Sequence, residues 1–74
     1  MEYAVLNEKK TGERIKELRK MLHLTVKDVS TYMGFESAQA VYKWQRGESL
    51  PTIDNLYALG KLFDMPVDEI LRGD

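Results

Sequence analysis

Apolar residues recur at helical spacing along most of the chain. The first such stretch places Ile15, Leu18 and Leu22 at i, i+3 and i+7, which is one face of a helix. We predict that this helix starts at Thr11 and ends near His23. Only residues 3–6 show the alternation of a strand, and we interpret residues 1–10 as an N-terminal arm that contact with a partner can order.

A second, shorter helix is predicted directly after the first. Thr25 and Asp28 have the spacing of a capping box, in which each residue bonds to the other's backbone N–H. Val29 and Met33 then form a short apolar stripe, and Gly34 suits the left-handed position that ends many helices. The pattern predicts a helix of about nine residues.

A third helix is predicted with Ser37 as its cap, Val41 and Trp44 as buried positions and Gly47 as its end. Two short helices joined by a tight turn that contains Gly are typical of the helix-turn-helix, whose second helix enters the DNA major groove. Ser30 supplies a small side chain where the two helices cross.

Two further helices complete the pattern. Thr52 is predicted to cap the fourth helix, and Pro66 is predicted to occupy the first position of the fifth. We therefore predict an all-α fold, a compact bundle of five short helices without a sheet, which occupies residues 11–74. The predicted inner positions of the last two helices are Leu56, Leu59, Gly60, Phe63, Val67, Ile70 and Leu71.

Size and composition exclude several classes of protein. A chain of 74 residues is one domain, and the absence of Cys excludes disulfides and thiolate metal sites. Because the single His23 has no metal-ligand partners near it in sequence, we expect no metal and no cofactor. One His without Cys also offers no nucleophile with a base, so we expect no enzyme. No apolar run suggests a membrane span or signal peptide, and we expect a cytoplasmic protein without a membrane partner.

The charge is divided unevenly along the chain. Residues 1–46 carry nine Lys and Arg against six Asp and Glu, a net charge of +3, whereas residues 47–74 carry two against six, a net charge of −4. The overall charge of −1 therefore hides a basic helix-turn-helix half. Such asymmetry suggests an anionic partner at one end.

The sequence resembles a known family over about residues 11–71. The segments GERIKELRK, LTVKDVSTYMG, AVYKWQRGESLP and NLYALGKLFDMPVDEIL resemble the Cro-like phage-repressor helix-turn-helix family, also called the xenobiotic-response-element (XRE) family of bacterial transcriptional regulators. The resemblance implies a lambda-repressor-like DNA-binding domain that binds a double-stranded operator as a homodimer. It favours a repressor over an activator. Because 74 residues leave no room for an effector domain, we expect no small-molecule effector.

The resemblance also implies which residues contact DNA, with the recognition helix at about residues 37–46 in the major groove. Gln39 is the strongest candidate for reading a base, because its amide can pair with both N6 and N7 of adenine. The base-contacting candidates are Ser37, Ala38, Gln39 and Lys43. The candidates for phosphate contact are Thr25, Lys27, Tyr42, Arg46 and Ser49.

Two features depart from the family pattern. Val26 occupies a position that is often Gln in the family, where it contacts phosphate and braces the third helix. The segment GFESAQAV is also one residue longer than the commonest spacing, so the register of residues 37–39 is open by one position.

The remaining candidates have structural interpretations. The expected core residues are Leu18, Val29, Met33, Val41, Trp44, Phe63, Met65 and the lone His23. Four basic residues of the first helix are interpreted as a solvated face paired with Glu13 and Glu17, namely Arg14, Lys16, Arg19 and Lys20.

The main alternative to DNA binding is a protein-binding module, such as an antitoxin or an adaptor, on the same scaffold. Positive charge around the third helix would favour DNA, whereas an apolar patch there would favour a protein partner. A second hypothesis is dimerisation through the last helix, which is rich in apolar residues: Met65, Val67, Ile70 and Leu71.

Overall fold

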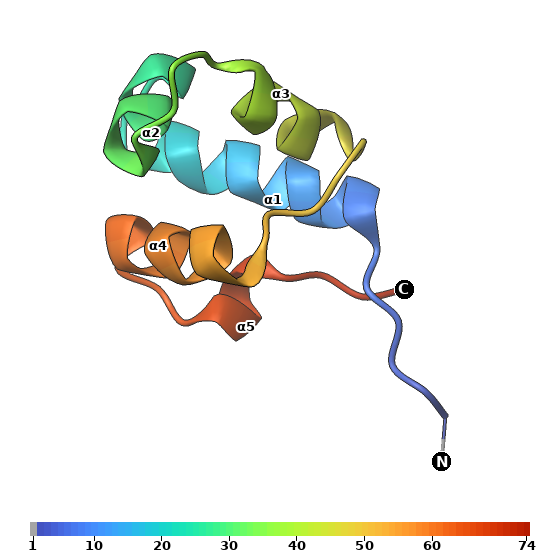
Figure 1. Cartoon of the computed structure of the whole chain (residues 1–74). Coiled ribbons are helices and arrows are strands. Elements are labelled where there is room, and N and C mark those ends of the chain that lie inside the picture. Colours follow the sequence, from blue (N-terminus) through green and yellow to red (C-terminus); the bar gives the residue numbers. More distant parts are fainter. Residues whose placement is uncertain (1) are drawn as a thin grey trace.

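A computed structural model describes residues 2–74 and contains five helices (Figure 1). The predicted all-α bundle is confirmed, because the described residues form helices and only one isolated β-bridge. Helix α1 lies in the middle and contacts α3 on one side and α5 on the other. The helices are α1 Glu8–Met21, α2 Val26–Met33, α3 Gln39–Arg46, α4 Ile53–Phe63 and α5 Val67–Ile70.

The predicted boundaries of α2 are confirmed by its hydrogen bonds and backbone angles. The Thr25 hydroxyl accepts from the N–H of Asp28 at 2.9 Å, and the Asp28 carboxylate accepts from the N–H of Thr25 at 2.8 Å. Gly34 ends α2 with a φ of 78°, in the left-handed region that glycine enters without steric cost. The Thr52 cap of α4 is also present.

The predicted start of the first helix is wrong by about one turn. Helix α1 begins at Glu8, because the Asn7 side chain accepts from the N–H of Lys10 at 2.8 Å and caps the helix. Asn is among the preferred capping residues, and Asn7 caps the helix one turn before Thr11, the predicted start. Thr11 and Gly12 are consequently buried in the body of α1.

The end of α1 also differs from prediction. The helix stops at Met21, so Leu22 leaves the buried face and is 46% exposed. His23 was predicted in the core, but it turns outward with a φ of 57° and is exposed. Because His23 has a left-handed backbone conformation, it does not continue the helix, and its side chain points away from the face that Ile15 and Leu18 form.

The start of α3 lies later than predicted. Ala38 occupies the cap position without a side-chain hydrogen bond, and the helix begins at Gln39. The Ser37 hydroxyl lies before the cap and accepts only a long bond of 3.4 Å from the N–H of Gln39. Pro66 likewise lies at the cap of α5 and not at its first helical position.

One core brings together all five helices. The buried apolar residues include most of the predicted core, but the predicted inner positions Leu56, Val67 and Leu71 are only half-buried. Met33 and Met65 pack against the core half-buried. Phe35 meets Trp44 edge to face, with ring centroids 5.8 Å apart. The buried apolar core consists of Ile15, Leu18, Val26, Val29, Val41, Trp44, Leu59, Phe63 and Ile70.

Helices α1 and α3 approach each other backbone to backbone at two glycines. A Cβ atom at Gly12 would lie 2.0 Å from the Trp44 carbonyl oxygen. A Cβ atom at Gly47, the residue that ends α3 with a φ of 75°, would lie 2.7 Å from the Lys9 Cα atom. Any larger side chain at Gly12 would therefore push α3 away from α1.

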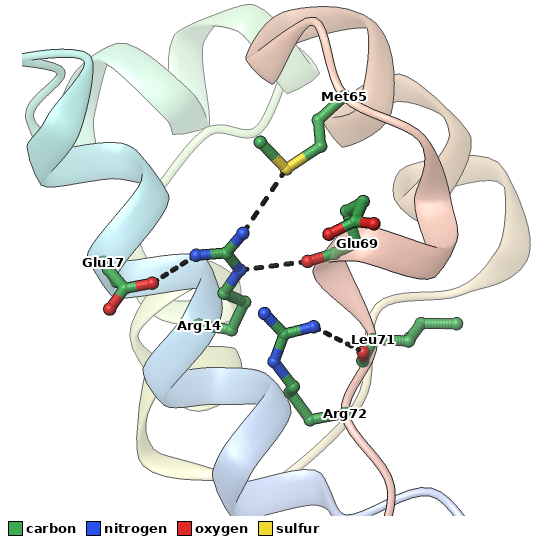
Figure 2. A network of polar contacts seen from close by, with 6 residues as sticks. All are labelled: Arg14, Glu17, Met65, Glu69, Leu71 and Arg72. Atoms are coloured by element: carbon green, nitrogen blue, oxygen red, sulfur yellow. Dashed lines mark hydrogen bonds and ion pairs between the residues drawn. The ribbon is translucent and has the colours of Figure 1, made fainter.

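The C-terminal segment is tied to the outer side of α1 (Figure 2). The Arg14 guanidinium donates to the Glu69 carbonyl oxygen at 2.9 Å and to the Met65 sulfur at 3.7 Å, and it pairs with Glu17. The predicted pairing of Arg14 with Glu17 is confirmed, but its side chain is only 17% exposed, so the predicted solvated position is wrong for Arg14. The buried Thr11 hydroxyl bonds to both the N–H and the carbonyl of Arg72.

The N-terminal arm pairs with the end of the same chain. Leu6 and Gly73 form an isolated antiparallel bridge, in which the N–H of Asp74 donates to the Val5 carbonyl at 3.1 Å. The N–H of Asn7 donates to the Arg72 carbonyl at 2.8 Å. These bonds join residues 5–7 to residues 72–74 beside the start of α1.

We expect Gly12→Ala to lower the free energy of unfolding by about 2–3 kcal/mol, because the new methyl group collides with a backbone carbonyl. Helix propensity alone would give the opposite sign, since Ala is better than Gly in a helix by about 1 kcal/mol. Urea denaturation measures the change. The neighbouring Glu13→Ala, at an exposed position, should stay within about 0.5 kcal/mol of the unmodified chain. Equal stability of the two variants would contradict the close contact.

The capping box predicts a pH dependence of stability. Hydrogen bonds from the N–H and then the hydroxyl of Thr25 lower the pKa of Asp28 from its ordinary value of 3.8. A lowered pKa in the folded state stabilises the fold above the unfolded-state value, and this contribution is lost as the pH falls below it. The urea midpoint of Asp28→Asn should therefore fall less than that of the unmodified chain when the pH drops below about 3.8.

Asp54→Asn provides the matched control, because Asp54 lies in the first turn of α4 and is exposed. Its pH profile should follow that of the unmodified chain. A profile of Asp28→Asn that coincides with both would refute a stabilising role of the ionised cap.

Candidate nucleic-acid interface

Helix α3 presents a polar face to solvent and an apolar face to the core. Val41 and Trp44 are buried, whereas the side chains at i, i+3, i+4 and i+7 from the helix start are exposed. Their spacing places them on one face of α3, ready to contact a partner. These exposed residues are Gln39, Tyr42, Lys43 and Arg46.

A groove runs along one side of this face, between α3, the end of α1 and the start of α2. We call it the basic groove, and it is lined by Lys16, Arg19, His23, Leu24, Thr25, Val26, Lys27, Tyr42, Gln45 and Arg46. Four of these residues are Lys or Arg, and none is Asp or Glu. Four of the nine basic residues of the N-terminal half therefore lie together beside α3.

The structure brings most of the predicted phosphate-contacting residues together. Thr25, Lys27, Tyr42 and Arg46 all line the basic groove. Ser49 does not, because it lies beyond the end of α3 on the other side of the helix.

The predicted base-contacting residues lie around a second groove on that other side. We call it the turn groove, and its polar lining includes Ser37, Gln39, Lys43, Ser49 and the acidic Glu36. Ala38 is absent from this lining, because it is half-buried and packs against the core. Gln39 and Lys43 therefore flank one edge of the exposed face of α3, and Tyr42 and Arg46 flank the other.

Two acidic residues modify the charge of this surface. Arg46 pairs with Glu48, and the hydrogen bond from the guanidinium lowers the pKa of that carboxyl group. Part of the Arg46 charge is therefore balanced within the chain. Asp28 caps the start of α2, so this helix end already holds an anion beside Thr25.

In the family pattern, the residue after the α2 cap supports α3, but Val26 does not have this role here. Val26 is buried and belongs to the core. In its place, the Arg19 guanidinium donates to the Gln45 side-chain oxygen and to the Leu24 carbonyl, each at 2.8 Å. Arg19 thus connects α1, the loop before α2, and α3.

Sequence reasoning assigned a DNA contact to four of the ten residues that line the basic groove and missed the other six, among them Lys16, Arg19 and Gln45. Lys16 is exposed as predicted, but Arg19 is half-buried, so the interpretation as a solvated face is wrong for Arg19. Its position offered a signal, because Arg19 follows the buried Leu18 and lies one turn after the buried Ile15. A long side chain at that edge of the stripe can lie along the core and keep its charge in the groove.

Residues 2–74 include no helix that is long and apolar enough to cross a membrane. Within the same range, no three His, Asp or Glu side chains gather in a way that would hold a metal ion.

Comparison with known sequences identifies a family and several relatives. A family model described as "Helix-turn-helix" (HTH_3) matches residues 15–70. Repressor protein C2 of Salmonella phage P22 is 33% identical over 69 residues, which are 93% of this chain and 32% of that protein. The HTH-type transcriptional regulator DicA of Escherichia coli (strain K12) is 40% identical over 63 residues, or 85% of this chain and 46% of DicA.

A third relative, the HTH-type transcriptional activator BcrR of Enterococcus faecalis, is 29% identical over 63 residues, or 85% of this chain and 30% of BcrR. The chain therefore spans a third to a half of the length of the curated relatives that it matches.

Solved structures show the same fold. The P22 c2 repressor, crystallised with a synthetic operator, superposes with a TM-score of 0.77 at 36% identity, covering 86% of this chain and 96% of that chain. The DNA-binding domain of BldD shares the fold with a TM-score of 0.74 at 24% identity, covering 89% and 94% of the two chains. The match over residues 15–70, together with these relatives, shows that this chain belongs to the XRE/Cro-like helix-turn-helix (HTH_3) family.

Proposed function

We propose that the protein binds double-stranded DNA sequence-specifically and regulates transcription. The observation that carries this proposal is the basic groove beside the exposed face of α3, because its lining contains four cationic side chains and no acidic one, with Arg46 alone of the four paired to a carboxylate, that of Glu48. Phosphate contacts of Lys and Arg supply most of the affinity for duplex DNA, and a helix of this size fits the major groove. Cations around α3 favour DNA over the protein partner of an antitoxin or adaptor.

In this proposal α3 enters the major groove with Gln39 leading. Gln39 is exposed at the first position of α3, where its amide reaches a base edge before the rest of the helix. Lys43 follows one turn later and reaches a guanine edge. Ser37 and Ala38 precede the helix, so they contact bases near its entry point.

The basic groove would then hold the DNA backbone. Phosphates on one side of α3 are contacted by Thr25 and Lys27 at the start of α2 and by Tyr42 and Arg46 on α3. Ser49 reaches the backbone from the turn groove, on the opposite side of α3. Contacts on both sides of α3 fix its depth and direction in the groove.

We propose repression as the regulatory effect. One relative is named a repressor and another an activator, so the names of the relatives do not distinguish repression from activation. A domain that covers operator DNA blocks other proteins by occupancy, and this requires no further surface. The operator complex of the P22 c2 repressor, a relative of the same fold, supports operator DNA as the partner.

We also propose that the chain binds its operator as a homodimer. The predicted interface at the last helix needs revision, because Ile70 is completely buried in the core of the monomer. The neighbouring surface of α4 offers a better apolar patch, since Ile53 is 86% exposed and Tyr57 is 62% exposed. The half-buried Met65 and Val67 extend this patch across a shallow pocket next to Tyr57.

Selection from a random duplex library tests the proposed function. We expect one enriched motif with two-fold symmetry and an affinity that falls steeply with salt. Repeating the titration at several salt concentrations gives the number of phosphate contacts. A library without an enriched motif, together with a flat salt dependence, would overturn the DNA proposal and favour a protein partner.

Gln39→Ala and Lys27→Ala should affect DNA binding in different ways. Loss of the base-reading amide should relax selectivity at one base pair and cost about 1–3 kcal/mol on the preferred operator only. Loss of the phosphate-binding cation should weaken binding on all sequences and reduce the slope of log K against log salt by about 0.9 per copy. Competition titrations with matched and mismatched duplexes separate the two effects, and identical selectivity of both variants would contradict the assigned roles.

Tyr57→Asp should abolish dimerisation, because it places a charge in the proposed apolar interface. Sedimentation velocity with and without operator measures the oligomeric state. Tyr32→Asp, on the 49% exposed Tyr32 of α2, is the matched control and should leave the dimer intact. A monomer at high concentration in the unmodified chain, alone and on the operator, would refute the homodimer.

A further inference from the structure

The single histidine of the chain lies in the basic groove. His23 follows α1 in the loop before α2, where its N–H donates to the Lys20 carbonyl at 3.0 Å. Its left-handed backbone, with a φ of 57°, turns the side chain away from the core, and the exposed imidazole lines the groove. The DNA contacts proposed above involve residues around His23 and leave its imidazole without a role.

No carboxylate of residues 2–74 forms an ion pair with this imidazole. The ion pairs of that range join Arg14 to Glu17 and Arg46 to Glu48, and His23 belongs to neither. An anion that enters the groove therefore meets the imidazole together with several cations. The charged and titratable side chains that line the groove with His23 are Lys16 and Arg19 from α1, Lys27 from α2, and Tyr42 and Arg46 from α3.

Two acidic residues lie next to groove residues, and both are already bonded. The Asp28 carboxylate caps α2, and that of Glu48 pairs with Arg46. These hydrogen bonds lower the pKa of both carboxyl groups, from the Thr25 N–H for Asp28 and from the Arg46 guanidinium for Glu48. Both carboxylates therefore stay ionised near neutral pH. Histidine is the side chain that ordinarily changes charge between about pH 5 and about pH 8, and His23 is the one histidine of the groove.

A phosphate in the groove favours the charged form of an imidazole. An anion in contact stabilises the imidazolium, and the charge strengthens a hydrogen bond from a ring N–H to a phosphate oxygen. A neutral imidazole carries one N–H donor, whereas an imidazolium carries two. Protonation therefore adds both a charge and a donor on the side of the groove that α1 and α2 form.

We propose that His23 binds a DNA phosphate as an imidazolium and takes up a proton from the solvent when the protein binds its operator. The inference deepens the proposed function, on which it rests. Because the complex then holds more protons than the free protein, the affinity for DNA rises as the pH falls from about 8 to about 6. The Lys and Arg contacts supply no such dependence, since those side chains keep their charge over this range.

Fluorescence anisotropy with the selected operator duplex, at about pH 6, 7 and 8 and at several salt concentrations, is the test. For the unmodified chain we expect the association constant to rise about fivefold per copy bound between about pH 8 and about pH 6. The slope of log K against log salt should steepen over the same interval by up to about 0.9 per copy, because one more phosphate contact forms.

Two substitutions fix the charge of residue 23 at different values. His23→Asn is neutral at every pH, and Asn tolerates the left-handed backbone of this position. His23→Lys is charged throughout the range. Each variant should bind with the same affinity at about pH 6 and about pH 8. At about pH 8, His23→Lys should bind more tightly than the unmodified chain, by about fivefold per copy.

A histidine outside the groove is the matched control. Tyr32 is 49% exposed on α2 and does not line the groove, so Tyr32→His in the His23→Asn background restores a titratable imidazole at a different place. This double variant should keep the pH-independent affinity of His23→Asn. Thermal unfolding of each variant over the same pH range separates an effect on DNA contact from an effect on stability.

No pH dependence in the unmodified chain, or an equal dependence in His23→Asn, would overturn the inference and leave the proposed function standing. A pH-dependent unfolding temperature with an unchanged salt slope would assign the proton to the stability of the fold, and it would overturn the inference as well. Failure of the unmodified chain to bind any duplex at any pH would overturn the proposed function and the inference with it.

Discussion

The contact between α1 and α3 at Gly12 is the constraint on which the rest of the structure depends. A hydrogen atom is the only side chain that lets the Trp44 carbonyl approach the α1 backbone so closely. A second close contact lies about one turn earlier on α1, where the Lys9 backbone approaches Gly47 at the end of α3. Because the two helices touch through backbone atoms, no flexible side chain separates them, and the direction of α3 follows directly from that of α1.

This constraint positions the proposed interface. With Trp44 and Val41 fixed against α1, the opposite face of α3 points outward and carries its polar side chains in one row. Arg19 fixes the same helix from the other end of α1 through Gln45. The short α2, capped by Thr25, then closes the basic groove against α3. Fold and binding surface therefore share the same contacts, and a change at the crossing would disturb both.

The sequence predicted what local chemistry controls. The capping box of α2 and the stops at Gly34 and Gly47 depend on residues within one turn, and the structure confirms them. It failed at two helix starts, where Asn7 and Ala38 occupy the cap positions in place of Thr11 and Ser37, and it failed where distant segments meet. The pattern of α1 alone predicted that Arg14 and Arg19 are solvated. However, Arg14 contacts residues that lie 51 or more positions away in the sequence, and Arg19 bonds to Gln45, which lies 26 positions away. The position of Arg19 at the edge of the buried stripe of α1 indicated that it could be partly buried, but the sequence pattern did not identify the partner of either arginine.

NMR chemical-shift mapping of the ¹⁵N-labelled chain with its selected duplex tests the central claim most directly, namely that the surface held by the α1–α3 crossing is the DNA-binding surface. The account predicts the largest amide shifts from Thr25 to Lys27 and from Ser37 to Ser49, with the Arg19 Nε–H resonance moving along with them. Residues of α4 and α5 outside the dimer patch should stay unchanged. Shifts concentrated on α4 and α5, with α3 unperturbed, would contradict the account.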